Sequence, residues 1–221
     1  ELHIFAPKGA EEIINLQLKL TKSWVQYPIC FHELKSKKSE LIFEDEKVEV
    51  FTIPLKHRIY TNGFLFKEKL GDRKLNMSKI LPIKEIEICD YQNLKKGKDF
   101  LKESGEIIPN KILTKDPLPP VSYAYCSDTA YSEDIISTIK NVDLLYHEST
   151  FLEDNVELAE KTKHSTALQA ALIAKKAEVK KLILGHYSSR YKNLEVFKTE
   201  AQTLFKNSEL AEEGEIFSVE N

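Results

Sequence analysis

The chain has 221 residues, of which 42% are hydrophobic and 30% charged, and its formal net charge is −3 at pH 7. These values are ordinary for a globular domain and exclude disordered and collagen-like classes, and no apolar run reaches the roughly 20 residues of a membrane span. The net charge excludes a generally basic nucleic-acid coat, although a local basic patch remains compatible with it.

Three cysteines, Cys30, Cys89 and Cys126, are widely spaced and form no CxxC pair. This pattern indicates neither a disulfide framework nor a cysteine-type zinc site, and a reducing cytoplasm fits it. The sequence starts at Glu1 without an initiator methionine or a signal-peptide pattern. We therefore expect a soluble cytoplasmic protein with one main domain, and its true N-terminus is expected to lie before Glu1.

The first third of the chain predicts a strand, a helix and then several strands. Residues Leu2 to Phe5 are typical of a short strand, and Glu11 to Lys22 of an amphipathic helix. Four further segments predict strands, namely Val25 to Leu34, Leu41 to Phe43, Val48 to Ile53 and Tyr60 to Glu68. His57 lies in the connection between the last two of these strands.

Residues 71 to 120 show weak periodicity, many lysines and five prolines. About 50 such residues are long for a loop, which indicates an excursion with its own function or mobility. The basic side chains form either a solvated surface or an electrostatic grip on phosphates, and the residue pattern alone leaves both open. They are Arg73, Lys74, Lys79, Lys84, Lys95, Lys96, Lys98 and Lys102.

The rest of the chain alternates between strands and helices, which predicts an α/β layered fold. The expected strands are Val121 to Cys126, Val142 to Tyr146, Lys181 to Leu184 and Glu215 to Val219. The expected helices are Ser132 to Lys140, Leu152 to Lys161, one that begins at Ser165-Thr166, and Glu195 to Lys206.

Three of these strands run directly into side chains that can do chemistry. Asp128 follows the first, His147-Glu148 the second and His186 the third. Because parallel strands carry functional groups at their carboxyl ends, we expect these side chains to meet, with His57 added from a fourth strand end. The combination of imidazole and carboxylate without cysteine suits Zn²⁺ or Mn²⁺ holding an activatable water.

A carboxylate can bridge two cations, and two cations can clamp a phosphodiester. Asp128 would then be the bridge, with His57 on one metal and His186 on the other. Three protein groups are too few to hold two metals, so either the site has one metal or the chain is a fragment. Both alternatives stay open at this point.

Two histidines are left for roles other than ligation. A protonated His147, held by Glu148, can donate a proton to a leaving alkoxide. Hydroxyl groups, helix-start N–H groups and an arginine bind phosphate oxygens. The candidates for phosphate or RNA binding are His164, Ser165, Thr166, Ser188, Ser189 and Arg190. Plain N-capping of a helix is the alternative for Ser165 and Thr166.

These motifs, in this order and spacing from Leu2 to Val219, resemble tRNase Z (ribonuclease Z), the tRNA 3′-processing endonuclease family of the metallo-β-lactamase superfamily. Ser127-Asp128-Thr129 resembles the family's Gly-Asp-Thr motif, and His147-Glu148-Ser149-Thr150 its His-Glu-Ala-Thr motif. Lys163 to Thr166 resembles its His-Ser-Thr loop, Leu184 to Tyr191 its final metal motif, and Pro54 to Arg58 with Tyr60 to Gly63 its upstream metal-histidine motif.

The resemblance implies an α/β metallo-β-lactamase αβ/βα sandwich, truncated at its N-terminus, with two Zn²⁺ ions. It implies that His57 and His186 bind different zincs, that Asp128 bridges them and that His147 acts in proton transfer. Precursor tRNA is the implied substrate, cleaved to leave a 3′-hydroxyl. Residues 71 to 120 correspond to a flexible arm, or exosite, that grips the tRNA elbow and serves the partner subunit of a homodimer. Lys95, Lys96 and Lys98 are the exosite candidates.

Two departures from the family pattern matter. The His-x-His-x-Asp-His motif, which supplies four zinc ligands, is expected before Glu1, so the printed polypeptide is expected to bind zinc poorly and to be inactive, although the intact protein would be an enzyme. The arm also lacks the family's Gly-Pro-rich signature, with Leu81-Pro82-Ile83 the nearest match. Two alternatives remain, a small-molecule hydrolase of the same superfamily and a truncated, non-catalytic module for tRNA binding or dimerisation.

Overall fold

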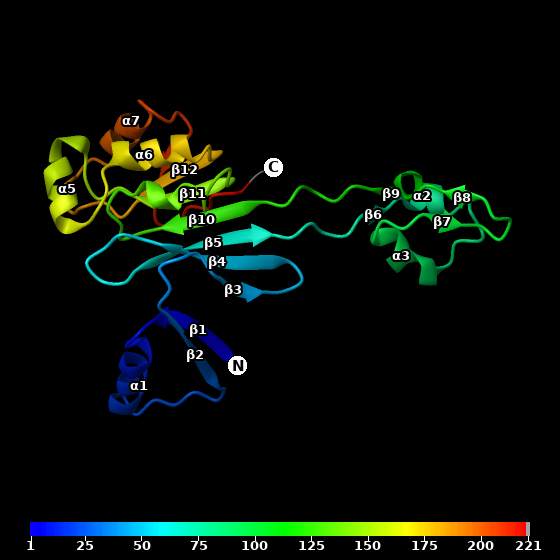
Figure 1. Cartoon of the computed structure of the whole chain (residues 1–221), viewed down its shortest axis with the longest axis horizontal. Coiled ribbons are helices and arrows are strands. Elements are labelled where there is room, and N and C mark those ends of the chain that lie inside the picture. The colour runs from blue at the N-terminus through cyan, green and yellow to red at the C-terminus, as the bar shows by residue number, and fades with distance from the viewer. Residues whose placement is uncertain (220–221) are drawn as a thin grey trace. The chain divides into compact units, whose positions relative to one another are not determined.

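A computed structural model describes residues 1–219 of the chain (Figure 1). The chain divides into two compact units. Among the described residues, the sheet unit consists of Glu1–Lys67 and 121–219, and the insert unit consists of Glu68–Pro120. Within the described residues, no helix is long and apolar enough to cross a membrane.

The sheet unit is built on seven strands in the order β13-β12-β11-β10-β5-β4-β3. β10 to β13 run parallel, whereas β5 is antiparallel to β10 and β3 is antiparallel to β4. The strands are β3 (Leu41–Glu44), β4 (Val48–Pro54), β5 (Asn62–Glu68), β10 (Ser122–Cys126), β11 (Leu144–Glu148), β12 (Lys181–Gly185) and β13 (Ser208–Leu210). The carboxyl ends of β10, β11 and β12 therefore lie side by side at one edge of the sheet.

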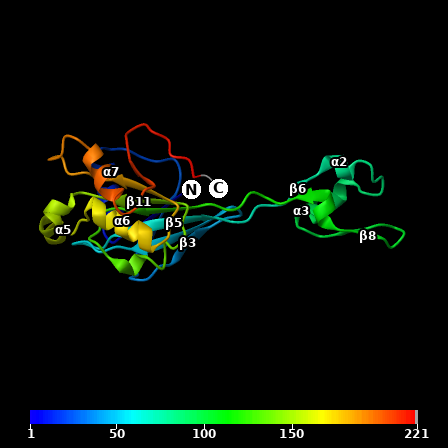
Figure 2. The ribbon, with the colours of Figure 1, turned by 90° about the horizontal axis from the view of Figure 1, so that it is seen from above.

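Helices α6 (Ala167–Lys176) and α7 (Glu195–Ala201) pack on one face of this sheet, with α5 (Val156–Thr162) beside them (Figure 2). Short 3₁₀ turns, η2 (Glu133–Ile135) and η3 (Glu153–Asn155), complete this half. The contact between α6 and the sheet is made by small side chains, because alanines allow a helix to approach closely. The fully buried alanines of this helix are Ala167, Ala170, Ala171 and Ala174.

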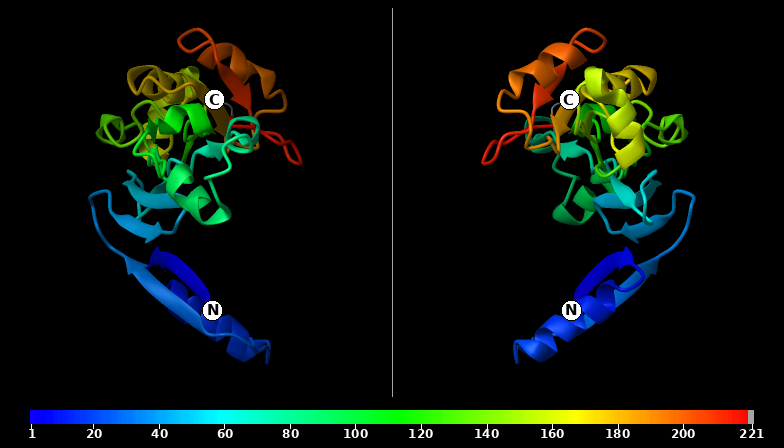
Figure 3. Two further views of the ribbon diagram at one scale, coloured as in Figure 1. Left: turned by 90° about the vertical axis from the view of Figure 1, so that its right-hand side faces the viewer. Right: turned by 90° about the vertical axis from the view of Figure 1, so that its left-hand side faces the viewer.

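The N-terminal segment, blue in Figure 3, is a strand, a helix and a second strand. β1 (Leu2–Pro7) and β2 (Ile29–Leu34) form their own two-stranded parallel sheet, connected by α1 (Ala10–Leu20). α1 has no buried residue. A two-stranded sheet of this size is marginally stable by itself.

The insert unit has its own small core, formed by Ile80, Ile86, Leu94 and Leu113. β6 pairs with β9 where the segment begins and ends, and β7 and β8 form a hairpin. Its elements are β6 (Lys74–Leu75), α2 (Met77–Ile80), η1 (Ile88–Asp90), α3 (Tyr91–Lys95), β7 (Phe100–Leu101), β8 (Ile107–Ile108), α4 (Asn110–Leu113) and β9 (Thr114–Lys115). An independent core and paired ends make the insert unit a folded body rather than a loop.

Two predicted elements are wrong. The expected strand at 215–219 is irregular backbone with Ile216 92% exposed, because β13 already occupies that edge of the sheet. The expected helix at 132–140 is only the short turn η2, capped by the Ser132 hydroxyl. Its β-branched residues, Ile135, Ile136, Thr138 and Ile139, disfavour a continuous helix.

Candidate active site

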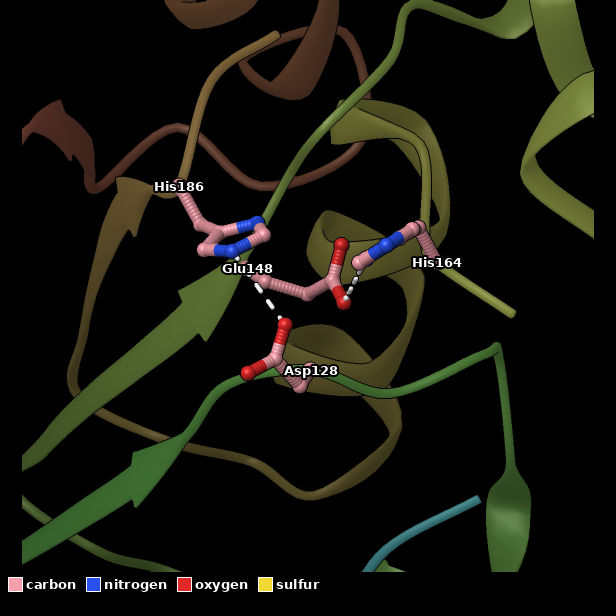
Figure 4. Close-up of side chains that lie close together, drawn as sticks. All are labelled: Asp128, Glu148, His164 and His186. Carbon is pink, nitrogen blue, oxygen red and sulfur yellow. Dashed lines mark hydrogen bonds and ion pairs between the residues drawn. The ribbon is translucent and has the colours of Figure 1, made fainter. Parts of the chain in front are cut away.

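Four side chains that can bind a cation converge beside the ends of the parallel strands (Figure 4). Asp128 follows β10, Glu148 ends β11, His186 follows β12, and His164 lies between α5 and α6. One ligand atom from each of the four lies within 4.8 Å of those from the other three. The site thus joins three strand-end groups with a histidine for which the sequence predicted phosphate binding.

The backbone is strained at two members of this group, Asp128 and His186. Asp128 has φ 57° and His186 has φ 60°, both in the left-handed region that non-glycine residues seldom adopt. Each such residue costs about 1–3 kcal/mol and persists only where its surroundings fix it. Gly185, directly before His186, leaves room for the Tyr146 side chain, since a Cβ there would lie 2.2 Å from the hydroxyl oxygen of Tyr146. Strain at these two positions points to a functional constraint.

Glu148 is fully buried and its carboxylate accepts four hydrogen bonds. The backbone N–H groups of Thr129 and Ser165 donate at 2.6 and 3.0 Å, the Thr150 hydroxyl at 2.7 Å and His164 Nδ1 at 2.9 Å. A carboxylate has about four lone-pair sites, so these donors use its capacity. Glu148 therefore positions its neighbours and is not free to act as a base or to ligate a metal.

The hydrogen bonds of Thr150 settle the tautomer of His186. Because the single hydroxyl proton of Thr150 goes to Glu148, its oxygen must accept the 2.8 Å hydrogen bond from His186 Nδ1–H. The other ring nitrogen, Nε2, then carries a lone pair and faces Asp128 Oδ1 at 3.2 Å. Two acceptor atoms facing each other require a cation or an added proton between them. This imidazole and carboxylate pair fits Zn²⁺.

His57 is oriented in the same way. Its Nδ1 lies 2.9 Å from the carbonyl oxygen of Lys163, which can only accept, so Nδ1 donates and Nε2 is free to ligate. The His57 ring centroid is 5.2 Å from that of His164, which is itself 5.2 Å from that of His186. The structure therefore brings His57 to the site, although outside the four-residue group.

His147 is placed differently from its predicted role as proton donor. It is 1% exposed, and its Nδ1 donates to the backbone carbonyl of Glu148 at 2.7 Å. Burial lowers the pKa of His147 below its usual value, so the ring stays neutral. Consecutive strand residues point to opposite faces, and for this reason the Glu148 carboxylate meets His164 and not His147. The geometry favours His164 as the donor.

Two predicted phosphate ligands are enclosed by protein, which corrects the expectation for them. Ser165 is fully buried and its hydroxyl donates to the carbonyl oxygen of Thr129 at 2.7 Å. Thr166 is also fully buried, and its hydroxyl accepts from Gln169 N and donates to Glu153. Thr166 forms a capping box with Gln169 at the start of α6, so the N-capping alternative holds for this residue.

Ser188, Ser189 and Arg190, which were also predicted to bind phosphate, follow His186 and are more accessible to solvent than Ser165 and Thr166. Arg190 is exposed, its Nε donates to the Ser188 hydroxyl at 3.2 Å, and its guanidinium carbon lies 5.2 Å from the centroid of the Phe151 ring. Ser189 is exposed as well. The Phe151 ring centroid is 6.4 Å from that of His164, so Arg190 presents its charge near the candidate proton donor.

A hollow of about 580 Å³ opens beside His57 and His164. Sequence reasoning missed four of its nine lining residues, Ala130, Tyr131, Glu160 and Gln169, because they lie outside the recognised motifs. It also missed the part played by Thr150, although the spacing of Thr150 from Glu148 within one motif is a usable signal. The lining residues are Leu55, Lys56, His57, Ala130, Tyr131, Glu160, Lys163, His164 and Gln169.

Comparison with known proteins finds relatives named ribonuclease Z that match nearly the whole chain. No family model matches the chain. The chain is 47% identical to ribonuclease Z of Cytophaga hutchinsonii over 222 residues, which cover 99% of the chain and 69% of that protein. It is 41% identical to ribonuclease Z of Bacteroides thetaiotaomicron over 221 residues, which cover 100% of the chain and 70% of that protein.

Solved structures with a similar fold are much more distant in sequence. The short form of human tRNase Z matches 99% of the chain and 68% of its own, with TM-score 0.63 and 19% identity. A metallo-β-lactamase fold protein of Bacillus subtilis matches 98% of the chain and 65% of its own, with TM-score 0.60 and 15% identity. These neighbours establish the fold class, a mixed α/β metallo-β-lactamase fold.

Proposed function

The chain belongs to the ribonuclease Z family, and we propose that the convergent histidines and carboxylates described above form the zinc-dependent centre of its tRNA 3′-processing activity. The curated relatives confirm the family resemblance and, with it, an endoribonuclease that acts on tRNA. The proposed reaction hydrolyses one phosphodiester at the 3′ trailer of precursor tRNA and leaves a tRNA 3′-hydroxyl.

The proposed metal ligands are His57, Asp128 and His186. The observation that carries this assignment is the pair of acceptor atoms, His186 Nε2 and Asp128 Oδ1, facing each other at 3.2 Å. The second oxygen of Asp128 is available to bridge to another cation, which His57 would hold through Nε2. When bound, Zn²⁺ lowers the pKa of a coordinated water and offsets the charge of the phosphodiester oxygens.

The proposed proton donor is His164, held by Glu148. The buried carboxylate accepts from Nδ1 at 2.9 Å, so the ring is fixed with Nε2 available to carry a proton to the leaving oxygen. Through Thr150 the same carboxylate also orients His186. Arg190 would pair with a neighbouring phosphate, because a guanidinium binds phosphate oxygens in a fork.

The insert unit is the proposed exosite for tRNA. It carries 11 basic and 9 acidic residues, and several of these pair, including Lys96 with Asp72 at 2.9 Å and Lys102 with Glu106 at 2.7 Å. The unit therefore has an excess of only two positive charges, and Lys95, Lys96 and Lys98 are proposed as contacts because they lie close together in the sequence. We also propose a cytoplasmic homodimer in which this unit serves the partner subunit.

One experiment tests the centre directly. The intact protein, its Asp128→Ala variant and its His186→Ala variant would be compared for bound zinc by atomic absorption and for cleavage of a precursor tRNA. Both variants should lose zinc and at least about 100-fold in cleavage rate, because each removes a proposed ligand. Full zinc content and turnover in both variants would refute the centre. Unchanged tRNA affinity would show that their loss is catalytic.

A further inference from the structure

A second group of ligand-bearing side chains lies on the β1–β2 pair. Glu1, His3 and Cys30 each offer one ligand atom, and these three atoms lie within 4.8 Å of one another. His3 Nε2 is 3.2 Å from Glu1 Oε1, and Cys30 Sγ is 3.9 Å from Glu1 Oε2. None of these residues belongs to the active-site group, and their donor set differs because it includes a thiol.

The parallel register explains why these residues meet. His3 pairs with Cys30 and Phe5 pairs with His32 across the two strands. Since alternate strand residues share a face, His3, Phe5, Cys30 and His32 all lie on the same face of the β1–β2 sheet. His3 and Cys30, which are direct partners in the register, are thus brought together by backbone pairing.

His32 supplies the support that a metal-binding histidine commonly has. His32 Nε2 lies 2.8 Å from His3 Nδ1, and the two rings stack with centroids 5.1 Å apart. The Phe5 ring stacks on the other histidine, His32, at 4.4 Å. With a metal on Nε2, Nδ1–H of His3 would donate to His32 Nε2, and His3 Nε2 already lies 3.2 Å from Glu1 Oε1.

We propose that Glu1, His3 and Cys30 bind one Zn²⁺ ion, separate from the active-site metal. Zinc takes imidazole, thiolate and carboxylate together in tetrahedral geometry, with water in the fourth position. Cys30 binds as the thiolate, and its proton leaves to solvent, so binding strengthens as pH rises. A soft thiolate disfavours Mg²⁺ and Ca²⁺, which prefer oxygen ligands.

The structural consequence is a cross-link between two weakly held strands. β1 and β2 form a two-stranded sheet whose connecting helix, α1, has no buried residue. Such a sheet is marginal in water, and a metal that joins His3 on β1 to Cys30 on β2 would stabilise it by binding only the folded form. The ion would therefore act as a structural staple.

Cobalt substitution tests this proposal with a readout that the active site cannot give. Co²⁺ bound by a thiolate shows intense sulfur-to-metal charge-transfer absorption in the near ultraviolet, and none of the proposed active-site ligands is a cysteine. The protein with Co²⁺ should show this absorption, and the His186→Ala variant should keep it. Cys30→Ser and His3→Ala should lose it, and Cys30→Ser should bind one Zn²⁺ fewer per chain.

Cys89→Ser is the matched control, because Cys89 is an exposed cysteine of the insert unit. It should keep both the absorption and the zinc count. Amide hydrogen exchange gives a second measurement, in which Zn²⁺ should slow exchange in β1 of the protein but not of Cys30→Ser. The proposal is overturned by absence of the absorption in the protein, or by its persistence in Cys30→Ser with an unchanged zinc count.

Discussion

At the scale of single residues, Glu148 organises the site. Its carboxylate fixes His164 directly and His186 through Thr150. A buried carboxylate with four donors is a rigid reference point, because removing any donor leaves part of a charge unsatisfied. The two histidines it orients have separate proposed roles, metal binding for His186 and proton donation for His164, so their variants should differ in substrate dependence.

The His164→Ala variant should lower cleavage of precursor tRNA by roughly 100-fold or more, since the leaving ribose oxygen needs a proton. Bis(p-nitrophenyl) phosphate has a leaving group that departs without one, so its hydrolysis should fall by less than about 10-fold. Steady-state kinetics on both substrates would measure the difference. His147→Gln is the comparison, because the sequence predicted that residue as the donor. The assignment to His164 fails if His147→Gln alone shows the selective loss.

His147 should influence stability through pH. Burial lowers its pKa in the folded protein below the ordinary 6.5, so just below pH 6.5 the unfolded chain binds a proton that the folded chain does not. The contribution of His147 to the free energy of unfolding should therefore be constant above pH 6.5 and fall by about 1 kcal/mol per pH unit just below it. The free energy of unfolding would be measured by urea titration at pH 7.5 and pH 5.5. The difference between the two values should be smaller in His147→Asn than in the unmodified protein. An identical difference in that variant would contradict the prediction.

At the scale of elements, the N-cap of α6, Thr166, both stabilises the helix and lies next to a residue that contacts Glu148. Thr166 caps the helix immediately after Ser165, whose backbone N–H donates to Glu148. Thr166→Ala should lower the free energy of unfolding by about 1 kcal/mol, because it leaves a helix N–H unsatisfied. Thr166→Ser keeps the hydroxyl and should stay close to the native value in urea titrations. Equal stability of the two variants would show that the cap contributes little.

The sequence predicts these elements well wherever one face is strongly apolar. β10, β11, β12 and the alanine-rich α6 all lie within or close to their predicted ranges. The prediction of a strand at 215–219 is wrong because an apolar residue pattern does not reveal whether an edge of the sheet is free to pair. In the site, adjacency in sequence suggested that Glu148 holds His147. In a strand the side chains of His147 and Glu148 point to opposite faces. Only the tertiary structure shows that the loop between α5 and α6 places His164 beside the Glu148 carboxylate.

At the scale of the whole molecule, the proposal assigns chemistry to the sheet unit and tRNA recognition to the insert unit. The sheet unit contains the candidate metal ligands, and the insert unit has its own core and the lysines proposed to bind tRNA. With a net charge of −3, tRNA binding depends on where positive charge is placed rather than on its total. This arrangement predicts that charge removed from the insert unit matters more than the same charge removed elsewhere.

The triple variant Lys95→Ala, Lys96→Ala and Lys98→Ala should weaken tRNA binding and reduce the slope of log affinity against log salt. Each lost phosphate contact lowers that slope by roughly 0.7–0.9, so the total change should approach 2 to 3 if all three lysines touch phosphate.

A matched triple variant of Lys35, Lys37 and Lys38 to alanine removes the same charge from the sheet unit. It should leave the slope of log affinity against log salt nearly unchanged, because lysines that do not contact phosphates displace no counterions from the tRNA. Filter binding of precursor tRNA over a range of salt concentrations measures both slopes. Hydrolysis of bis(p-nitrophenyl) phosphate should be equal in the two variants, since neither alters the metal ligands. Equal slopes for the two triple variants would show that Lys95, Lys96 and Lys98 do not contact the tRNA phosphates.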